Sequence, residues 1–230
     1  HGVRTLGVDP AANLAALMSE KGIERYVGFF NSETAKYIVK KWGQASVITA
    51  TNTFPHIPDL KDFVAGIKLA LAPGGMFVIE AHYLVDLLLQ GAFDTIYHEH
   101  VSYWALKPMM TLFENNGMSI VEAERLPLHH GQLRVTVKRQ GEGQGQSSVE
   151  TILKMEKAKG IDEFKTYQQF AQQTQKIKLD LHDVLKRLRA QDKSVVGYGA
   201  PAKGNTLLSF LEIGPELLTY IADRSPLKQG

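Results

Sequence analysis

The chain has 230 residues, of which 44% are hydrophobic and 22% charged, and its formal net charge is +2. These values are typical of a globular protein that could form one large domain or one and a half smaller ones, and they exclude a disordered or fibrous class. The lysines and arginines are scattered, which argues against a nucleic-acid partner, and the absence of cysteine excludes disulfides and thiolate metal sites.

The longest apolar runs, such as residues 69–72, are far shorter than a membrane span. No signal peptide opens the sequence. We therefore expect a soluble, cytoplasmic protein with no membrane partner, acting on a small substrate.

Three short apolar segments in the first third of the chain predict buried strands. They cover residues 3–9, 46–52 and 75–81. A helix is expected to start near Ala11, a helical pattern spans residues 60–71, and Pro73-Gly74-Gly75 predicts the turn from that helix to the third strand. Strands that alternate with helices indicate parallel βαβ units and an α/β fold.

Polar residues stand at the ends of these three strands. They are Asp9, Asn52 and Glu80. Ligands of open α/β sheets bind at the carboxyl ends of the strands, where an acid such as Asp9 can bind a ribose. A helix-capping aspartate is an equally weighted alternative for this residue.

Residues 97–103 place five groups that can move or share protons within seven positions, beginning Tyr97-His98-Glu99-His100. This density predicts acid–base chemistry. A surface loop with incidental histidines and a His-x-His metal pair are the alternatives. In an extended segment Glu99 would face away from His100. We therefore expect a turn here, or a histidine partner from elsewhere.

The second half of the chain predicts a boundary and a long helix. A helix near residues 107–116 is followed by strands at 118–122 and 133–138, the latter an antiparallel partner. The glycine-rich segment 141–146 reads as a linker. Residues 162–190 predict one amphipathic helix that acts as a strut between domains.

A glycine loop follows the next predicted strand. Residues 197–206 contain G-x-G-x-x-A before a helix, and Asp223 closes another strand about 20 residues later. Its backbone amides and Lys203 could bind a phosphate. A tight turn without a ligand is the alternative reading.

Five motifs, in order along nearly the whole chain, resemble the S-adenosylmethionine-dependent C-methyltransferases of deoxysugar biosynthesis, which act on nucleotide-linked keto sugars. The motifs are residues 6–11, 52–60, 93–100, 130–135 and 198–206. The resemblance implies a Rossmann-like methyltransferase sheet whose first strand is missing, then a long helix and the start of a second Rossmann-like domain. The expected divisions are residues 1–140, 141–192 and 193–230. The cysteine-rich zinc module of the family would precede this chain, so both ends look truncated.

The resemblance also implies roles for individual residues. His100 is the expected general base, with Tyr97, Glu99 and His56 in supporting catalytic roles. Residues expected to bind S-adenosylmethionine are Asp9, Thr51 and Asn52. Residues expected to bind the sugar nucleotide are Gly197, Gly199, Lys203 and Asn205.

The implied chemistry is consistent with these residue types. Methylating carbon requires a base to remove a proton beside a carbonyl and a donor to stabilise the enolate, and it requires no metal. Two alternatives stay open: an NAD(P)-dependent oxidoreductase that uses residues 197–206, and a non-catalytic truncated fragment that folds as a homo-oligomer.

Overall fold

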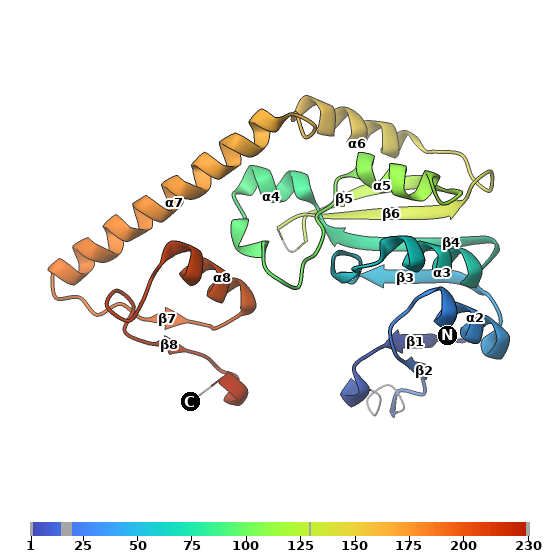
Figure 1. Ribbon diagram of the computed structural model, residues 1–230, viewed down its shortest axis with the longest axis horizontal. Helices are drawn as coiled ribbons and strands as arrows, with labels where there is room; N and C mark the ends of the chain where they lie inside the picture. The colour runs from blue at the N-terminus through green and yellow to red at the C-terminus, as the bar shows by residue number, and fades with distance from the viewer. Residues whose placement is uncertain (1, 15–19, 129, 229–230) are drawn as a thin grey trace.

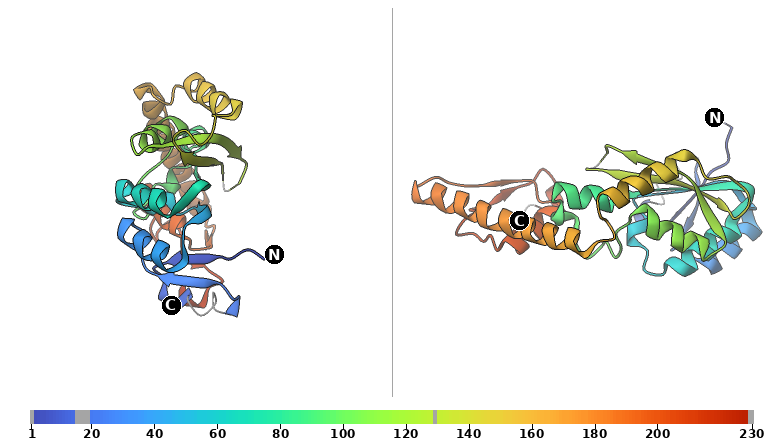
Figure 2. Two further views of the ribbon diagram at one scale, coloured as in Figure 1. Left: turned by 90° about the vertical axis from the view of Figure 1, so that its right-hand side faces the viewer. Right: turned by 90° about the horizontal axis from the view of Figure 1, so that it is seen from above.

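The computed structural model describes residues 2–14, 20–128 and 130–228. Figure 1 shows an elongated molecule with a larger α/β unit at one end and a small β-α-β unit at the other. The long helix α7 (Phe164–Ala190) runs between them, as the view from above in Figure 2 also shows. Its predicted role as a strut is consistent with this placement.

The larger unit contains two sheets. Strands β1 (Leu6–Asp9) and β2 (Glu24–Val27) form a parallel pair. The second sheet has the order β3-β4-β6-β5, and its strands are β3 (Ala45–Thr51), β4 (Leu71–His82), β5 (Met118–Leu126) and β6 (Gln132–Arg139). β3 and β4 are parallel, whereas β6 is antiparallel to both neighbours. The predicted α/β class and the antiparallel partner strand are confirmed.

Alternation along β4 gives this second sheet one apolar and one polar face. Phe77, Ile79 and Ala81 are fully buried in the main core. Glu80 and His82 point to the other face. The core is completed by apolar side chains of helices α3 (Leu60–Ala70), α5 (Leu106–Glu114) and α6 (Ser147–Ala158).

Helix α6 extends the first unit beyond the predicted boundary at residue 140. Val149 and Ile152 belong to the main core, and Ile161 closes it. Glu156 is buried and accepts hydrogen bonds from the Tyr83 hydroxyl at 2.8 Å and the Leu106 amide at 2.5 Å. The segment without regular structure at 141–146 is therefore a loop within the first unit.

One further expectation needs correction. Residues 73–75 lie inside β4, where the pairing with β3 passes from Leu71 to Met76, and Gly74 has φ +72°. The helix expected to start near Ala11 falls mostly on residues 15–19, which lie outside the described residues, and a 3-10 turn at Ala12–Leu14 precedes them. The patterns also gave no prediction for β2, α2 (Ser32–Trp42), α4 (Leu84–Gln90) or α6.

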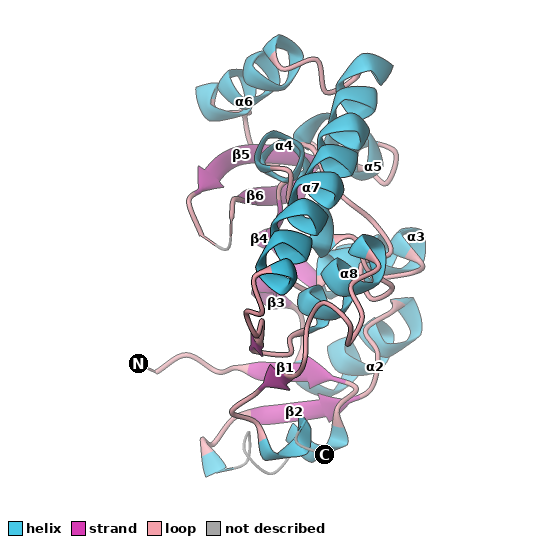
Figure 3. Cartoon of the chain, turned by 90° about the vertical axis from the view of Figure 1, so that its left-hand side faces the viewer, coloured by secondary structure: helices cyan, strands magenta, loops and turns pink. Residues whose placement is uncertain are grey.

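The small unit consists of β7 (Gly197–Tyr198), α8 (Ala202–Leu211) and β8 (Ile221–Ala222), with the strands parallel. Figure 3 shows α8 beside α7. His182 of α7 hydrogen-bonds the Leu211 carbonyl, and Lys178 forms an ion pair with Glu212 at 2.7 Å. On its other side, the Phe210 ring lies 5.0 Å from the Phe93 ring of the first unit. None of the helices in the described part of the chain is long and apolar enough to cross a membrane.

Candidate active site

The candidate site lies at the carboxyl ends of the parallel strands. In Figure 1, β1, β3 and β4 point toward the side of the molecule where α4 and the small unit lie. After α4 the chain forms the 3-10 turn Phe93–Thr95 and then residues 96–103, which contain most of the predicted catalytic groups. Strand ends and a crossing loop thus form the site together.

His100 has a fixed tautomer. Its Nδ1 lies 2.9 Å from the Thr95 carbonyl oxygen, which can only accept, so Nδ1 carries the hydrogen. Nε2 therefore has the free electron pair, and the Tyr97 hydroxyl donates to it at 3.3 Å. The His100 amide donates to the Tyr97 carbonyl at 3.0 Å, which confirms the predicted turn.

Aromatic and histidine rings surround His100, which is 7% exposed. The ring centroids of His56 and His82 lie 4.9 and 5.1 Å from the His100 centroid, and the Tyr97 centroid lies at 4.4 Å. The expected histidine partners from elsewhere are therefore present. The Nδ1 of His56 donates to the Glu99 carbonyl at 2.7 Å, so neutral His56 is an acceptor at Nε2.

These surroundings tune the two titrating groups. Burial is the largest effect and lowers the pKa of His100, and the hydrogen bond to the Thr95 carbonyl, which raises it, is the next largest. The positive charges of His56 and then Lys203 lower the pKa by smaller amounts, and the charge of Glu99 raises it least. His100 is therefore neutral near pH 7, as a base must be. Burial, and then the charge of Glu99, raise the pKa of Tyr97, which keeps its hydroxyl protonated as a donor.

The Glu99 carboxylate lies outside this cluster of rings. Its side chain is 55% exposed and its Oε1 is 4.0 Å from Nε2 of His98, which is 87% exposed. The orienting role expected of this carboxylate falls to the Thr95 carbonyl. The described residues contain no group of three or more His, Cys, Asp or Glu side chains that could hold a metal ion.

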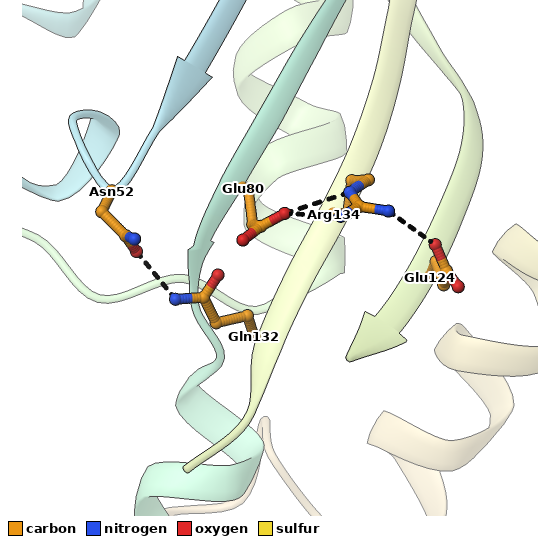
Figure 4. Close-up of polar contacts among 5 residues, drawn as sticks. All are labelled: Asn52, Glu80, Glu124, Gln132 and Arg134. Carbon is orange, nitrogen blue, oxygen red and sulfur yellow. Dashed lines mark hydrogen bonds and ion pairs between the residues drawn. The ribbon is translucent and has the colours of Figure 1, made fainter. Parts of the chain in front are cut away.

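The residues expected to bind the cofactor lie at two strand ends. Asp9 Oδ1 accepts from the Ala11 amide at 2.7 Å, as in the capping alternative. Asn52 has φ +53°, and its Oδ1 accepts from Gln132 at 2.8 Å (Figure 4). Thr51 is exposed. A carboxylate, an amide and a hydroxyl at one edge suit the ribose and amino groups of S-adenosylmethionine, so the donor set fits this cofactor.

The glycine loop at residues 197–206 is held by hydrogen bonds to the carboxylate of Asp223. The Ala200 amide donates to Asp223 Oδ2 at 2.6 Å, and the Ser225 amide donates to Asp223 Oδ1 at 2.7 Å. Asp223 therefore holds the loop. Gly199 has φ +88°, and Lys203 in the first turn of α8 is close enough to His100 to act on its charge.

Sequence patterns gave no role to three residues around His100. Thr95 acts through its backbone carbonyl, which has no signature in the sequence. His82 ends β4, two residues after Glu80, and this spacing could have identified it. Tyr103, whose ring centroid is 6.1 Å from that of His100, lies within the tyrosine- and histidine-rich run.

Two family models together match almost the whole chain. Residues 1–123 match the family model described as methyltransferase domain, and residues 127–230 match the C-methyltransferase C-terminal domain. The chain therefore belongs to the methyltransferase-domain family. The resemblance to C-methyltransferases found in its motifs is confirmed.

The C-methyltransferase NovU of Streptomyces niveus is 36% identical over 230 residues, which is all of this chain and 55% of that protein. The chain thus spans about half the length of this relative. Among solved structures, an S-adenosylmethionine-dependent methyltransferase of Anabaena variabilis has a TM-score of 0.47 and 14% identity, over 60% of this chain and 68% of that one. LepI in complex with SAM has a TM-score of 0.48 and 13% identity, over 61% and 37%.

Proposed function

We propose that the chain belongs to an S-adenosylmethionine-dependent C-methyltransferase whose substrate is a nucleotide-linked keto-deoxysugar. The observation that carries the proposal is the buried His100, whose Nε2 is held as a basic nitrogen beside the Tyr97 hydroxyl. The similarity to a protein named C-methyltransferase supports the reaction class. The sugar substrate rests on the motif resemblance.

His100 acts as the general base in this proposal. Its Nε2 takes a proton from the carbon beside the substrate carbonyl, and the C–H electron pair becomes the enolate. S-adenosylmethionine would be held by Asp9, Thr51 and Asn52 and would supply an electrophilic methyl group. The enolate carbon forms the new C–C bond as the S–CH3 bond breaks, its electron pair leaves on sulfur as S-adenosylhomocysteine, the carbonyl is restored, and His100 returns its proton to water.

Tyr97 is the donor to the enolate oxygen. Its hydroxyl rests on Nε2 of His100, and it turns to the developing oxyanion when the substrate occupies that nitrogen. His56 could donate from Nε2 only when protonated, because its Nδ1 hydrogen is already given to the Glu99 carbonyl. Neutral His56 therefore supports the site through its packing on His100.

The small unit binds the nucleotide part of the substrate. Lys203 lies in the first turn of α8, where the helix amino end favours an anion. Gly197 and Gly199 allow close approach of a diphosphate, and Asn205 is exposed on the next turn. This arrangement would place the sugar between the loop and His100.

Solvent-deuterium exchange tests the proton-abstraction step directly. The full-length protein, with S-adenosylhomocysteine bound, is mixed in D₂O with a thymidine-diphosphate-linked 4-keto-6-deoxyhexose, and proton NMR follows the hydrogen beside the carbonyl. We expect exchange that slows by about 10²–10⁴-fold in His100→Asn. His98→Asn, at an exposed position, is the matched control and should exchange at the wild-type rate.

Calorimetric titration separates this proposal from the oxidoreductase alternative. S-adenosylhomocysteine should bind, whereas NAD should not. Binding of NAD alone, or a wild-type protein that catalyses no exchange, would contradict the proposal.

A further inference from the structure

Gln132 lies at the ligand-binding edge although it begins its strand. Because β6 is antiparallel to β4, the first residue of β6 meets the carboxyl end of β4, and Gln132 pairs with His82 in the register. The His82 ring in turn contacts the His100 ring at 5.1 Å. One cross-strand step therefore separates Gln132 from a neighbour of the proposed base.

The side-chain amide of Gln132 is buried, and its nitrogen forms a hydrogen bond whereas its oxygen forms none with the described residues. The residue is 0% exposed, and its Nε2 donates to Asn52 Oδ1 at 2.8 Å. Its Oε1 is also buried and has no hydrogen-bond partner within residues 2–14, 20–128 and 130–228. Figure 4 shows this oxygen turned away from Asn52, on the face of the sheet that also carries Glu80.

Asn52 fixes the orientation of the Gln132 side-chain amide. Asn52 adopts a left-handed conformation, and its amide donates to the Glu80 carbonyl at 2.7 Å. The Asn52 side chain therefore stays in place as acceptor for Gln132 Nε2. An unpaired buried acceptor destabilises the free protein, and a ligand that brings a donor removes this cost on binding.

We infer that Gln132 is a substrate-binding residue whose Oε1 accepts a hydrogen bond from a sugar hydroxyl near the carbon that loses its proton. The inference rests on the proposed function. An acceptor oxygen cannot bind the carbonyl or the enolate oxygen, which are acceptors themselves. The group that Gln132 binds must carry a hydrogen, so this residue selects sugars that keep a hydroxyl there.

The amino group of the cofactor could also donate a hydrogen bond to Gln132 Oε1. The position of Gln132 favours the substrate hydroxyl as the donor. Gln132 pairs with His82, which packs on the proposed base, whereas Asn52 is the member of the pair proposed to face the cofactor. Loss of a hydrogen bond at such a buried site discriminates strongly between ligands with and without the hydroxyl.

The test is Gln132→Met in the full-length protein, since methionine has nearly the same shape but no acceptor oxygen. We expect KM for the thymidine-diphosphate-linked 4-keto-6-deoxyhexose to rise about tenfold with kcat changed less than about twofold. Affinity for S-adenosylhomocysteine, measured by calorimetry, should fall by less than about twofold, because Asn52 loses the Gln132 donor but keeps its backbone bond to the Glu80 carbonyl. Thr136→Val is the matched control, because Thr136 lies on the same face of β6 and hydrogen-bonds Glu122, away from the ligand edge.

A second measurement varies the substrate. Wild-type protein is compared on probe sugars that lack one hydroxyl at a time, and one deoxygenated position should raise KM about tenfold in the wild type. That increase should be absent in Gln132→Met if the hydroxyl and Oε1 form one contact.

Three outcomes would overturn the inference. A larger loss of affinity for S-adenosylhomocysteine at constant KM would assign the donor to the cofactor. An unchanged KM with every deoxygenated probe would mean that no hydroxyl is bound by this oxygen. A wild-type protein that neither exchanges deuterium nor binds S-adenosylhomocysteine would remove the proposed function and this inference together.

Discussion

At the scale of single residues, the pKa of His100 sets the low-pH limit of activity in the proposed function, where His100 is the base. The base works only when neutral, so kcat/KM should rise with pH through a pKa lower than that of an ordinary histidine and then level off. His56→Asn removes a positive charge that lowers this pKa. We therefore expect the rise to move to higher pH in that variant.

A pH–rate profile of kcat/KM checks this expectation, with His98→Asn as control. His98 is exposed, and its replacement should leave the profile unchanged. A profile of His56→Asn that coincides with the wild type would show that the two imidazoles do not interact in solution.

Gly131 lies at a position where a side chain would have no room. It has φ +106°, and an added Cβ would lie 2.3 Å from the buried carboxyl group of Asp86, which pairs with Arg125. Gly131→Ala should lower the free energy of unfolding by about 2–4 kcal/mol, measured in urea. Gly141→Ala, with φ +84° and no atom within 4 Å, should cost only about 1 kcal/mol.

Part of the site could be predicted from residue types alone. The density of acid–base side chains in residues 97–103 predicted acid–base chemistry there, whereas the roles of His100 and Tyr97 were implied by the family resemblance. The Thr95 carbonyl and the half-satisfied Gln132 could not be predicted, since each depends on which atoms lie beside it in the folded chain.

At the scale of elements, Glu156 connects α6 to the start of α5. It accepts from the Tyr83 hydroxyl and from the amides of Leu106 and Lys107, at 2.8, 2.5 and 3.2 Å. Glu156→Ala would leave these buried donors without a partner and expose the amino end of α5. We expect a loss of about 3 kcal/mol or more in the free energy of unfolding.

Urea unfolding followed by circular dichroism measures this loss. Glu150→Ala on the same helix is the control, because Glu150 is 74% exposed and pairs with Lys154 on the surface, so its removal should cost under about 0.5 kcal/mol. Equal losses in the two variants would contradict the capping role.

Elements were predictable where one physical signal dominated. The apolar runs of β3 and β4 and the long amphipathic pattern of α7 were found from sequence. Strand β2 (Glu24–Val27) has mostly exposed residues and no apolar run, so it gave no signal. Helix α6 was not predicted, and its contact with α5 is made by Glu156, which is 50 positions away from Leu106 in the sequence.

At the scale of the whole molecule, the Phe93–Phe210 contact and the α7–α8 contacts bring Lys203 to the catalytic edge. The sequence predicted both units but not their docking, because the contacts join residues far apart in the chain. Two functions for one lysine follow: it lowers the pKa of His100, and in the proposed function it binds the diphosphate. Both functions require α8 to lie close to His100.

Lys203→Gln separates this docking from a local role of the loop. Loss of the charge should weaken binding of thymidine diphosphate by about tenfold or more and move the rise of kcat/KM to higher pH, because the repulsion that lowers the pKa of His100 is removed. Lys176→Gln is the control, since Lys176 is 73% exposed on α7 and pairs with Asp180. Weaker binding with an unchanged profile would mean that Lys203 binds phosphate without approaching His100, whereas a shift in both ties the two units into one catalytic site.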